Sequence, residues 1–354
     1  MRALTAKLSL AALPFVVMVA ISYHVDPAHL FGYGPEAQVA ALLADGHAVI
    51  SPRAFEPRLV QREYVRHLRQ APDVVAFGSS RAMQIRSAAF PGQRFVNTGV
   101  FGASIEDLVA MAGLYDGAGM MPREVVLDLD PWVLNKQSGL TAWTALAAEY
   151  GYMARKLGFR VRGLTRFVRP TFDKYAQLGS PAYFQLSLPL FFKPVQADPV
   201  VISDGVPGEV AILLADASRV EARVNRELTP AGVAQLARKN IAAAYYVSGF
   251  RELDPLAQEQ FERLVGYFVS AGVRVTLLLV PYHPVMFEAF KNNPAYRAIA
   301  MQEDYFRAFA KESGVPLLGS YDPARVGCSD AEFFDGWHPR ESCVNRVLAS
   351  TPKP

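Results

Sequence analysis

The chain has 354 residues, a net charge of +3, and a composition that is 51% hydrophobic and 19% charged. This balance excludes an intrinsically disordered chain, which would be poor in apolar residues. The small net charge, without a lysine-rich run, argues against nucleic acid as a partner. The length allows one large domain or two modest ones, and the two cysteines and six histidines form no metal-binding motif, so we expect no metal site.

The amino terminus carries Arg2 and Lys7 and then runs from Leu8 to Tyr23 without a charge. As a helix, this stretch is about 24 Å long, slightly less than the roughly 30 Å hydrocarbon core of a bilayer. A cleaved secretory signal and an uncleaved signal anchor both fit it. We favour the anchor, because Met18-Val19-Ala20 is a poor cleavage sequence. Residues 1–7 are then cytoplasmic, and the chain crosses a bacterial inner membrane once into the periplasm.

Residues 24–72 are expected to form a juxtamembrane linker and a charged amphipathic lead-in helix near residues 58–70. Five short apolar runs beyond them are typical of buried strands and cover residues 73–80, 94–100, 124–130, 273–280 and 315–320. Helices are expected over about 105–115, over about 255–271, and from near 339. The first of them follows Ser104, whose spacing from Asp107 resembles a capping box. This alternation predicts an α/β fold with a central parallel sheet and helices on both faces.

Residues 158–250 break the alternation of strands and helices. They contain a Phe- and Pro-rich run, SPAYFQLSLPLFFKPV, and end in the helix-like LTPAGVAQLARKNIAAAYYV. We interpret this segment as an insertion between the third and fourth strands. It either shapes a substrate groove, as such segments often do, or is elaboration without a functional role. Residues 73–354 then form one domain that carries this insertion.

The residues beyond the carboxyl ends of the strands are the candidates for chemistry, because open parallel sheets bind ligands there. The first strand ends in Gly78-Ser79-Ser80. A serine at a strand-to-helix turn holds its hydroxyl clear of the sheet, and the helix amides behind it can stabilise negative charge. His338, on a long loop after the fifth strand, is the candidate base, with Asp335 to orient its imidazole. The sequence therefore predicts a triad of Ser80, His338 and Asp335.

Through these residues the sequence resembles the SGNH, or GDSL-like, hydrolases and acyltransferases. The first family block, Gly-Asp-Ser, corresponds to Gly78-Ser79-Ser80, and the last block, Asp-x-x-His, corresponds to Asp335 and His338. The second block, Asn-x-Gly-x-x-Gly, corresponds to residues 97–102. The resemblance implies that the backbone N–H groups of Gly102 and Ser80 form an oxyanion hole.

The third family block, an Asn after the third strand, is missing. Asp130-Pro131-Trp132 stands in its place, and Asn135 lies too far along the chain, so the third oxyanion donor is not identified. The single anchor, the Gly-Ser-Ser and this missing Asn resemble a membrane-anchored branch of the family. That branch includes the D-alanyl transfer protein of teichoic acid assembly and periplasmic proteins that O-acetylate exopolysaccharides. The resemblance covers about 73–135 and 273–349, and not the insertion.

The resemblance implies a three-layer SGNH-type fold and a periplasmic acyltransferase. An acyl-Ser80 intermediate would pass an acetyl or other acyl group to a hydroxyl of an exopolysaccharide or cell-envelope glycan. No cofactor is implied, and a membrane-bound O-acyltransferase partner would supply the acyl group. Two alternatives stay open: a serine esterase of the same mechanism, and a non-catalytic component of a polysaccharide export complex.

The two cysteines, Cys328 and Cys343, can pair in an oxidising compartment. They would close a loop of about 15 residues that contains Asp335 and His338, and such a loop is worth roughly 3 kcal/mol in the chain-entropy model. The alternative is two buried thiols. The weaker substrate-binding candidates, each of which also has a structural interpretation, are Arg81, Trp132, His283 and Trp337.

Overall fold

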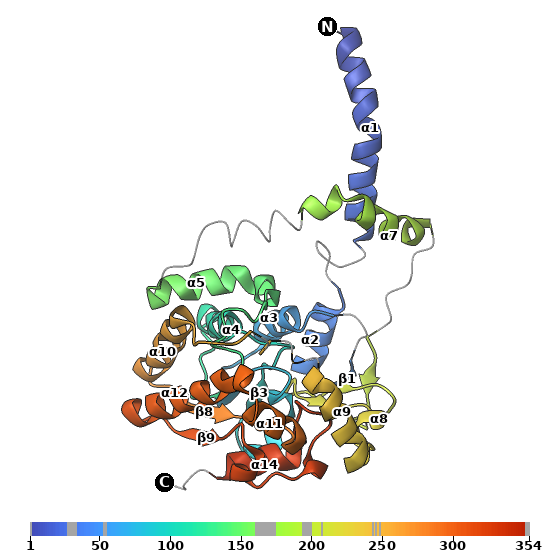
Figure 1. Ribbon diagram of the computed structural model, residues 1–354. Coiled ribbons are helices and arrows are strands. Elements are labelled where there is room, and N and C mark those ends of the chain that lie inside the picture. Colours follow the sequence, from blue (N-terminus) through green and yellow to red (C-terminus); the bar gives the residue numbers. More distant parts are fainter. Residues whose placement is uncertain are drawn as a thin grey trace.

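The computed structural model describes residues 2–26, 34–51, 55–159, 175–192, 200–206, 208–242, 244, 246–247 and 249–350. Parts of the expected linker (27–33 and 52–54) and of the expected insertion (160–174 and 193–199) lie outside these residues. The body of the protein is an α/β unit built on a five-stranded parallel sheet of order β3-β2-β4-β8-β9 (Figure 1). The strands are β2 (Val74–Phe77), β3 (Phe95–Asn97), β4 (Glu124–Asp128), β8 (Arg274–Leu279) and β9 (Leu317–Gly319). All five predicted strands are confirmed, in a parallel sheet.

Both faces of the central sheet are buried, because successive side chains of a strand point to opposite faces. One face packs Val75, Phe77 and Leu127 against helices α4 (Ile105–Gly117) and α10 (Pro255–Ser270). The other face packs its alternate residues, among them Val74, Ala76 and Val126, against α14 (Glu341–Ala349). Helices on both faces, as predicted, therefore fix the sheet and present its carboxyl edge to solvent.

The predicted helices are present, with small shifts at their ends. Helix α4 begins after Ser104, which accepts a hydrogen bond from the Asp107 N–H, while the Asp107 carboxylate accepts one from the Ser104 N–H at 2.8 Å, so the capping box is confirmed. The lead-in helix is α3 (Pro57–His67), and the last helix begins at Glu341. The further helices are α2 (Glu36–Ala44), α5 (Ala147–Leu157), α8 (Arg223–Arg226), α9 (Pro230–Ala242), α11 (Pro284–Lys291), α12 (Arg297–Ser313) and α13 (Pro323–Val326).

A second, antiparallel sheet was not predicted. It has the order β5-β1-β6-β7 and consists of β1 (Ala48–Ile50), β5 (Ile202–Ser203), β6 (Ile212–Leu213) and β7 (Arg219–Val220). Strands of two or three residues are too short to show an alternating pattern, which is why the sequence does not reveal them. The sheet joins the segment before the domain to the insertion, and the Gln84 side chain donates to the Arg219 carbonyl at 3.1 Å. It thereby brings part of the insertion beside the turn that follows β2.

Helix α1 (Arg2–Val25) stands clear of the body, and α7 (Pro181–Phe192) packs crosswise beside its carboxyl-terminal part (Figure 1). The Phe- and Pro-rich run thus lies against α1, far from the carboxyl edge of the sheet. None of the helices in the described ranges combines the length and the apolar character needed to cross a membrane.

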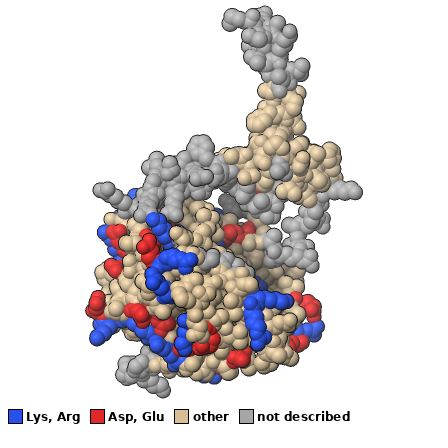
Figure 2. Space-filling model, viewed as in Figure 1, with Lys and Arg blue, Asp and Glu red and all other residues tan. Residues whose placement is uncertain are grey.

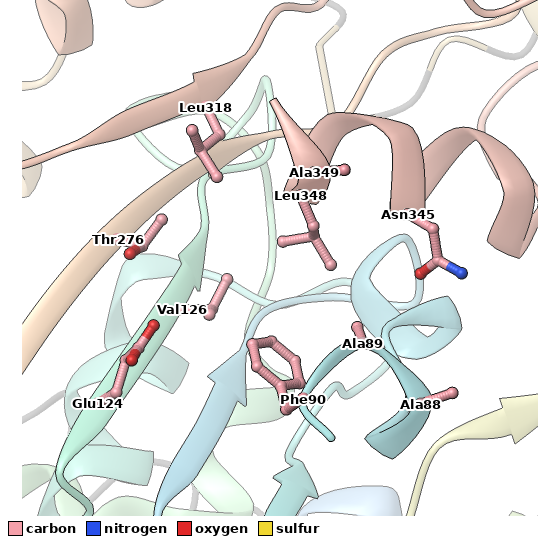
Figure 3. A pocket seen from close by; sticks show the side chains of 10 residues that line it. All are labelled: Ala88, Ala89, Phe90, Glu124, Val126, Thr276, Leu318, Asn345, Leu348 and Ala349. Atoms are coloured by element: carbon pink, nitrogen blue, oxygen red, sulfur yellow. The ribbon is translucent and has the colours of Figure 1, made fainter. Parts of the chain in front are cut away.

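A hollow of about 350 Å³ lies on the α14 face of the sheet (Figure 3). Its lining is mostly apolar and comes from β4, β8, β9, α14 and the segment 88–90. Glu124, the charged residue of this lining, begins β4 and is paired with Arg274 at 2.9 Å. Because Glu124 marks the amino-terminal end of its strand, the hollow is separate from the carboxyl edge at which ligands are expected.

Candidate active site

The candidate nucleophile, Ser80, lies on a tight turn directly after β2. A Cβ atom on Gly78 would lie 2.6 Å from the Asp128 Cβ and 2.8 Å from the Ala82 Cβ, so only glycine lets the chain turn here. The Ser79 hydroxyl accepts a hydrogen bond from the Arg81 N–H at 3.1 Å and holds the turn. The element behind Ser80 is a single 3₁₀ turn, Ala82–Gln84, instead of the expected helix, so a helix dipole contributes little to the site.

The three predicted triad residues are brought together. The Ser80 Oγ lies 2.9 Å from His338 Nε2, and His338 Nδ1 lies 2.9 Å from Asp335 Oδ2. Asp335 Oδ1 also accepts hydrogen bonds from the N–H groups of Trp337 and His338, at 2.7 and 2.9 Å. The loop therefore fixes the carboxylate, the carboxylate fixes the ring, and the ring presents Nε2 to the serine, which is the arrangement that nucleophilic catalysis requires.

The electrostatic environment of His338 suits a general base. Burial by itself would lower the pKa of His338, but the charge of Asp335 and its hydrogen bond outweigh it and raise the pKa above the ordinary 6.5. Burial would likewise raise the pKa of Asp335, but His338 and the two backbone N–H groups hold it below its usual value. His338 keeps 33% of its side chain exposed, so a substrate can reach it.

The pH dependence of serine acylation follows from the raised pKa of His338. The base must be neutral, so the rate should rise with pH through a midpoint above 6.5. The Glu221 carboxylate adds to the raised pKa, so Glu221→Gln should move this midpoint to lower pH. Burst kinetics with p-nitrophenyl acetate between pH 5 and 9 would measure both midpoints, with Asn225→Asp as an added-charge control that should move the midpoint the other way. An unchanged midpoint in Glu221→Gln contradicts the electrostatic coupling.

Gly102, the predicted oxyanion donor, has a left-handed backbone with φ +56°, which favours glycine. The preceding carbonyl, that of Phe101, accepts a hydrogen bond from Arg58 Nη2 at 3.1 Å. In a trans peptide the C=O and the next N–H point in opposite directions, so this bond turns the Gly102 N–H away from Arg58. Among the described residues, the N–H groups of Gly102 and Ser80 have no hydrogen-bond partner and are available to an oxyanion.

Asn97 ties the loop that carries Gly102 to the nucleophile turn. Its side-chain amide donates to the carbonyls of Ala82 and Ile85 at 2.9 and 2.8 Å, and its Oδ1 accepts from the Gly99 N–H at 2.8 Å. A Cβ atom on Gly99 would lie 2.9 Å from the Ser79 carbonyl oxygen, so this glycine allows the two loops to approach. The second motif therefore serves mainly to hold Gly102 and Ser80 in register.

Arg58 was missed by sequence reasoning. Its guanidinium forms two hydrogen bonds with Asp107, at 2.6 and 3.0 Å, and both side chains are buried. Asp107 in turn caps α4, the helix that starts after the loop of Gly102. Arg58 stands in the lead-in helix, 49 residues before its partner, and no motif marks it; a charged residue on the apolar side of α3 is the only signal the sequence offers.

Arg81, a substrate-binding candidate from sequence, is instead fully buried. It donates to the carbonyls of Val280 and Pro281, faces Asp130 at 3.8 Å and lies over the Tyr282 ring. With no exposed surface it cannot contact a substrate, and its role is to hold the strand ends beneath the triad. The missing third block thus corresponds to a buried charged cluster, in which burial raises the pKa values of Asp128 and Asp130.

Trp132 and His283 are also structural, which is the alternative that the sequence left open for each of them. Trp132 is buried and its indole N–H donates to the Ala103 carbonyl at 2.8 Å. His283 is buried, its Nδ1 accepts from the Val285 N–H at the start of α11, and its own N–H donates to the Gly336 carbonyl at 3.1 Å. His283 therefore supports the loop of the triad from below. Trp337 packs against Trp132 with ring centroids 6.0 Å apart and is likewise part of the core.

The predicted disulfide is confirmed. Cys328 and Cys343 are bonded, with Cα atoms 5.5 Å apart, and the loop they close contains Asp335 and His338. The sulfurs pack with Phe333 and with Val233 of α9, so the loop is also fixed to the insertion. The bridge holds two triad members on a segment that has little regular secondary structure of its own.

Removal of this disulfide is expected to cost stability. The double variant Cys328→Ala and Cys343→Ala should lose about 3 kcal/mol of unfolding free energy, since the loop has 15 residues. Urea unfolding with and without a reducing agent would measure the loss. The reducing agent should destabilise the native protein and leave the double variant unchanged; equal stability of both proteins would argue that the bond adds nothing.

A pocket of about 230 Å³ opens beside Ser80, Asp335 and His338. The insertion supplies one wall of it, through Arg219, Glu221, Asn225 and Leu236. Glu221 accepts hydrogen bonds from Arg219 at 2.7 Å and from Asn225 at 3.1 Å. The part of the insertion after residue 210 therefore shapes the groove, whereas α7, the described part of the Phe- and Pro-rich run, contributes no residue to it.

Tyr246 also belongs to the insertion and lies close to the loop that carries Gly102. A Cβ atom on Gly102 would be 3.3 Å from the Tyr246 hydroxyl oxygen. Its backbone has φ +71°, unusual for tyrosine, and is held by a hydrogen bond from Asn135 to the Tyr246 carbonyl at 2.6 Å and by the Trp132 ring. Asn135, too far along the chain to be a donor itself, thus places a phenol next to Gly102.

Neither the models of known protein families nor the curated proteins gave a match to this chain. The functional assignment therefore depends on the site itself, on its geometry and on the motifs that predict it.

Proposed function

We propose that the protein is a serine O-acyltransferase of the SGNH type. The observation that carries the proposal is the Ser80–His338–Asp335 triad beside the free N–H groups of Ser80 and Gly102. Triads of this geometry serve acyl transfer on several unrelated folds, so their function is recognised by geometry. The parallel sheet, with the nucleophile after its first strand and the base near the end of the chain, supports the same family.

The proposed reaction has two steps with one covalent intermediate. His338 Nε2 accepts the Ser80 proton as the serine oxygen bonds to the acyl carbon, and the N–H groups of Ser80 and Gly102 hold the oxyanion. The ester bond to the donor breaks, and His338 returns the proton to the departing oxygen. A hydroxyl of the acceptor then attacks the acyl-Ser80, gives its proton to His338, and the serine is regenerated.

Tyr246 is our candidate for the donor that the missing third block leaves unassigned. Its phenol O–H lies next to the Gly102 backbone, and a phenol can donate to an oxyanion. The positive φ of Tyr246 and its support by Asn135 agree with a position that is held for function.

The acceptor is proposed to be a glycan, and the pocket wall supports this. Arg219, Glu221 and Asn225 offer planar polar groups, and the Arg219 guanidinium lies over the Phe101 ring. Such a wall suits a ligand with several hydroxyl groups. We further propose, from the family resemblance and the uncharged run 8–23, a periplasmic, membrane-anchored protein that receives acyl groups from a membrane-bound O-acyltransferase.

Transfer and hydrolysis are separated by an acceptor experiment. The purified protein is given p-nitrophenyl acetate with and without soluble glycan oligomers, and both acetate release and acetylated glycan are measured. Acetylated glycan with little free acetate supports the transferase. Rapid acetate release that no acceptor changes supports the esterase, a candidate that the solvent access of His338 favours. No reaction, together with unimpaired polymer acetylation in cells carrying Ser80→Ala, supports a non-catalytic role.

A further inference from the structure

A two-helix unit formed by α1 and α7 lies outside the α/β body, and large apolar side chains are exposed on the part of its surface that the structure describes. Helix α7 has no charged residue over its twelve positions. Its side chains Leu186, Phe191 and Phe192 are exposed by 64, 43 and 74%. In Figure 2 the Lys, Arg, Asp and Glu side chains are spread over the body in patches, while the described part of this unit is almost entirely tan, the colour of all other residues. Large exposed apolar surfaces in a folded protein mark an interaction site.

Several polar groups of the unit are paired inside it, while His24 and Gln185 are exposed. The Tyr183 hydroxyl of α7 donates a buried hydrogen bond to Asp26 Oδ1, directly after α1, at a distance of 2.8 Å. The Ser187 hydroxyl donates to the Tyr183 carbonyl at 2.8 Å. The rings of His24 and Phe191 meet edge to face. Buried polar contacts beside large exposed apolar side chains suit an apolar environment better than water.

In the described middle of α1, the exposure runs around the full circumference of the helix. Residues 12–17 are all exposed, among them Leu13, Phe15, Val16 and Val17. Six consecutive residues exceed the 3.6 residues of one turn, so they cover the full circumference. A protein partner would be met by a stripe on one side, whereas an apolar surface on all sides suits a lipid solvent.

We propose that α7 is a second lipid-binding element, which lies in the outer membrane–water interface beside α1. Its axis runs across that of α1 (Figure 1), as expected for a helix that rests along the interface beside an anchoring helix, so the inference rests on the membrane anchor proposed above for α1. The buried Tyr183–Asp26 bond fixes the two helices to each other. The proposal does not depend on the serine chemistry. Its consequence is that the body is held to the membrane by two elements instead of one.

Site-specific fluorescence in the full-length protein tests the proposal. The two native cysteines are joined, so a single introduced cysteine is the only free thiol among all residues of the chain. Leu186→Cys and Phe192→Cys are labelled with an environment-sensitive fluorophore. Val224→Cys, on α8 of the body and 62% exposed, is the matched control. Each protein is reconstituted into vesicles of equimolar phosphatidylcholine and phosphatidylglycerol, with and without nitroxide-labelled lipid.

We expect the labels at 186 and 192 to shift to the blue and to be quenched by nitroxide lipid several-fold more than the label at 224. Equal access of aqueous iodide to all three labels overturns the proposal. Labels at 186 and 192 that are shielded from iodide but not quenched by nitroxide lipid also overturn the proposal. In that case a second copy or a protein partner covers α7. Failure of the protein to bind vesicles overturns it as well. Because α1 alone can retain the chain, only these local readouts report on α7.

Discussion

Ser80→Ala is expected to abolish the gain in mass that the protein shows after incubation with an activated acyl ester. Ser80 Oγ is the oxygen that His338 Nε2 contacts at 2.9 Å, and alanine leaves no atom to carry the acyl group. The rate of ester cleavage should fall on the order of 10³-fold or more, because the triad acts as a unit. Intact-protein mass spectrometry and p-nitrophenyl acetate turnover would measure the two effects.

The control for this prediction is Ser87→Ala. Ser87 is an exposed serine that follows the 3₁₀ turn behind Ser80. It should keep both the acyl adduct and the rate. His338→Ala should keep Ser80 but lose rapid acylation, since the hydroxyl then has no base. An adduct that persists in Ser80→Ala would place the nucleophile elsewhere, and the proposed mechanism would be wrong.

The central sheet could be predicted because its strands are buried apolar runs of three to six residues that need no partner to be recognised. The second sheet could not, since β5, β6 and β7 have two residues each and exist only through pairing with β1 and with one another. Helix α7 shows a related limit. For the insertion as a whole, the sequence left a groove wall and elaboration open, and only the contacts of α7 with α1 place this part of it elsewhere.

Some residues of the candidate site could likewise be predicted from the sequence, and others could not. The proximity of Ser80, Asp335 and His338 could be predicted, because these residues stand in short motifs at strand ends whose order along the chain resembles that of a known family. For Arg81 and Trp132 the sequence left a substrate contact and a structural role open, because a residue next to a motif can point either way, and their burial favours the structural role. Residues that act through pairing across the fold, such as Arg58 with Asp107 and Asn135 with Tyr246, leave no local pattern to read.

Arg58 is the positioning residue with the largest expected effect. Arg58→Met removes the donor to the Phe101 carbonyl and leaves the Asp107 carboxylate buried and unpaired. An uncompensated buried charge costs about 3–5 kcal/mol of stability. Loss of a well-oriented oxyanion donor, here the Gly102 N–H, costs on the order of 10²–10³-fold in kcat. The control is Arg66→Met on the same helix: the Arg66 guanidinium is exposed, and its partner Glu63 keeps a contact with Arg62, so the expected cost is at most about 1 kcal/mol.

The double variant Arg58→Met and Asp107→Asn separates the two roles. The asparagine oxygen can still cap α4 by accepting from the Ser104 N–H, and no charge is left unpaired, so most of the lost unfolding free energy should return. The Phe101 carbonyl still lacks its donor, so kcat for p-nitrophenyl acetate should stay low while KM changes little. If kcat instead recovers together with stability, Arg58 only stabilises the fold, because the oxyanion loop would then keep its orientation without the guanidinium.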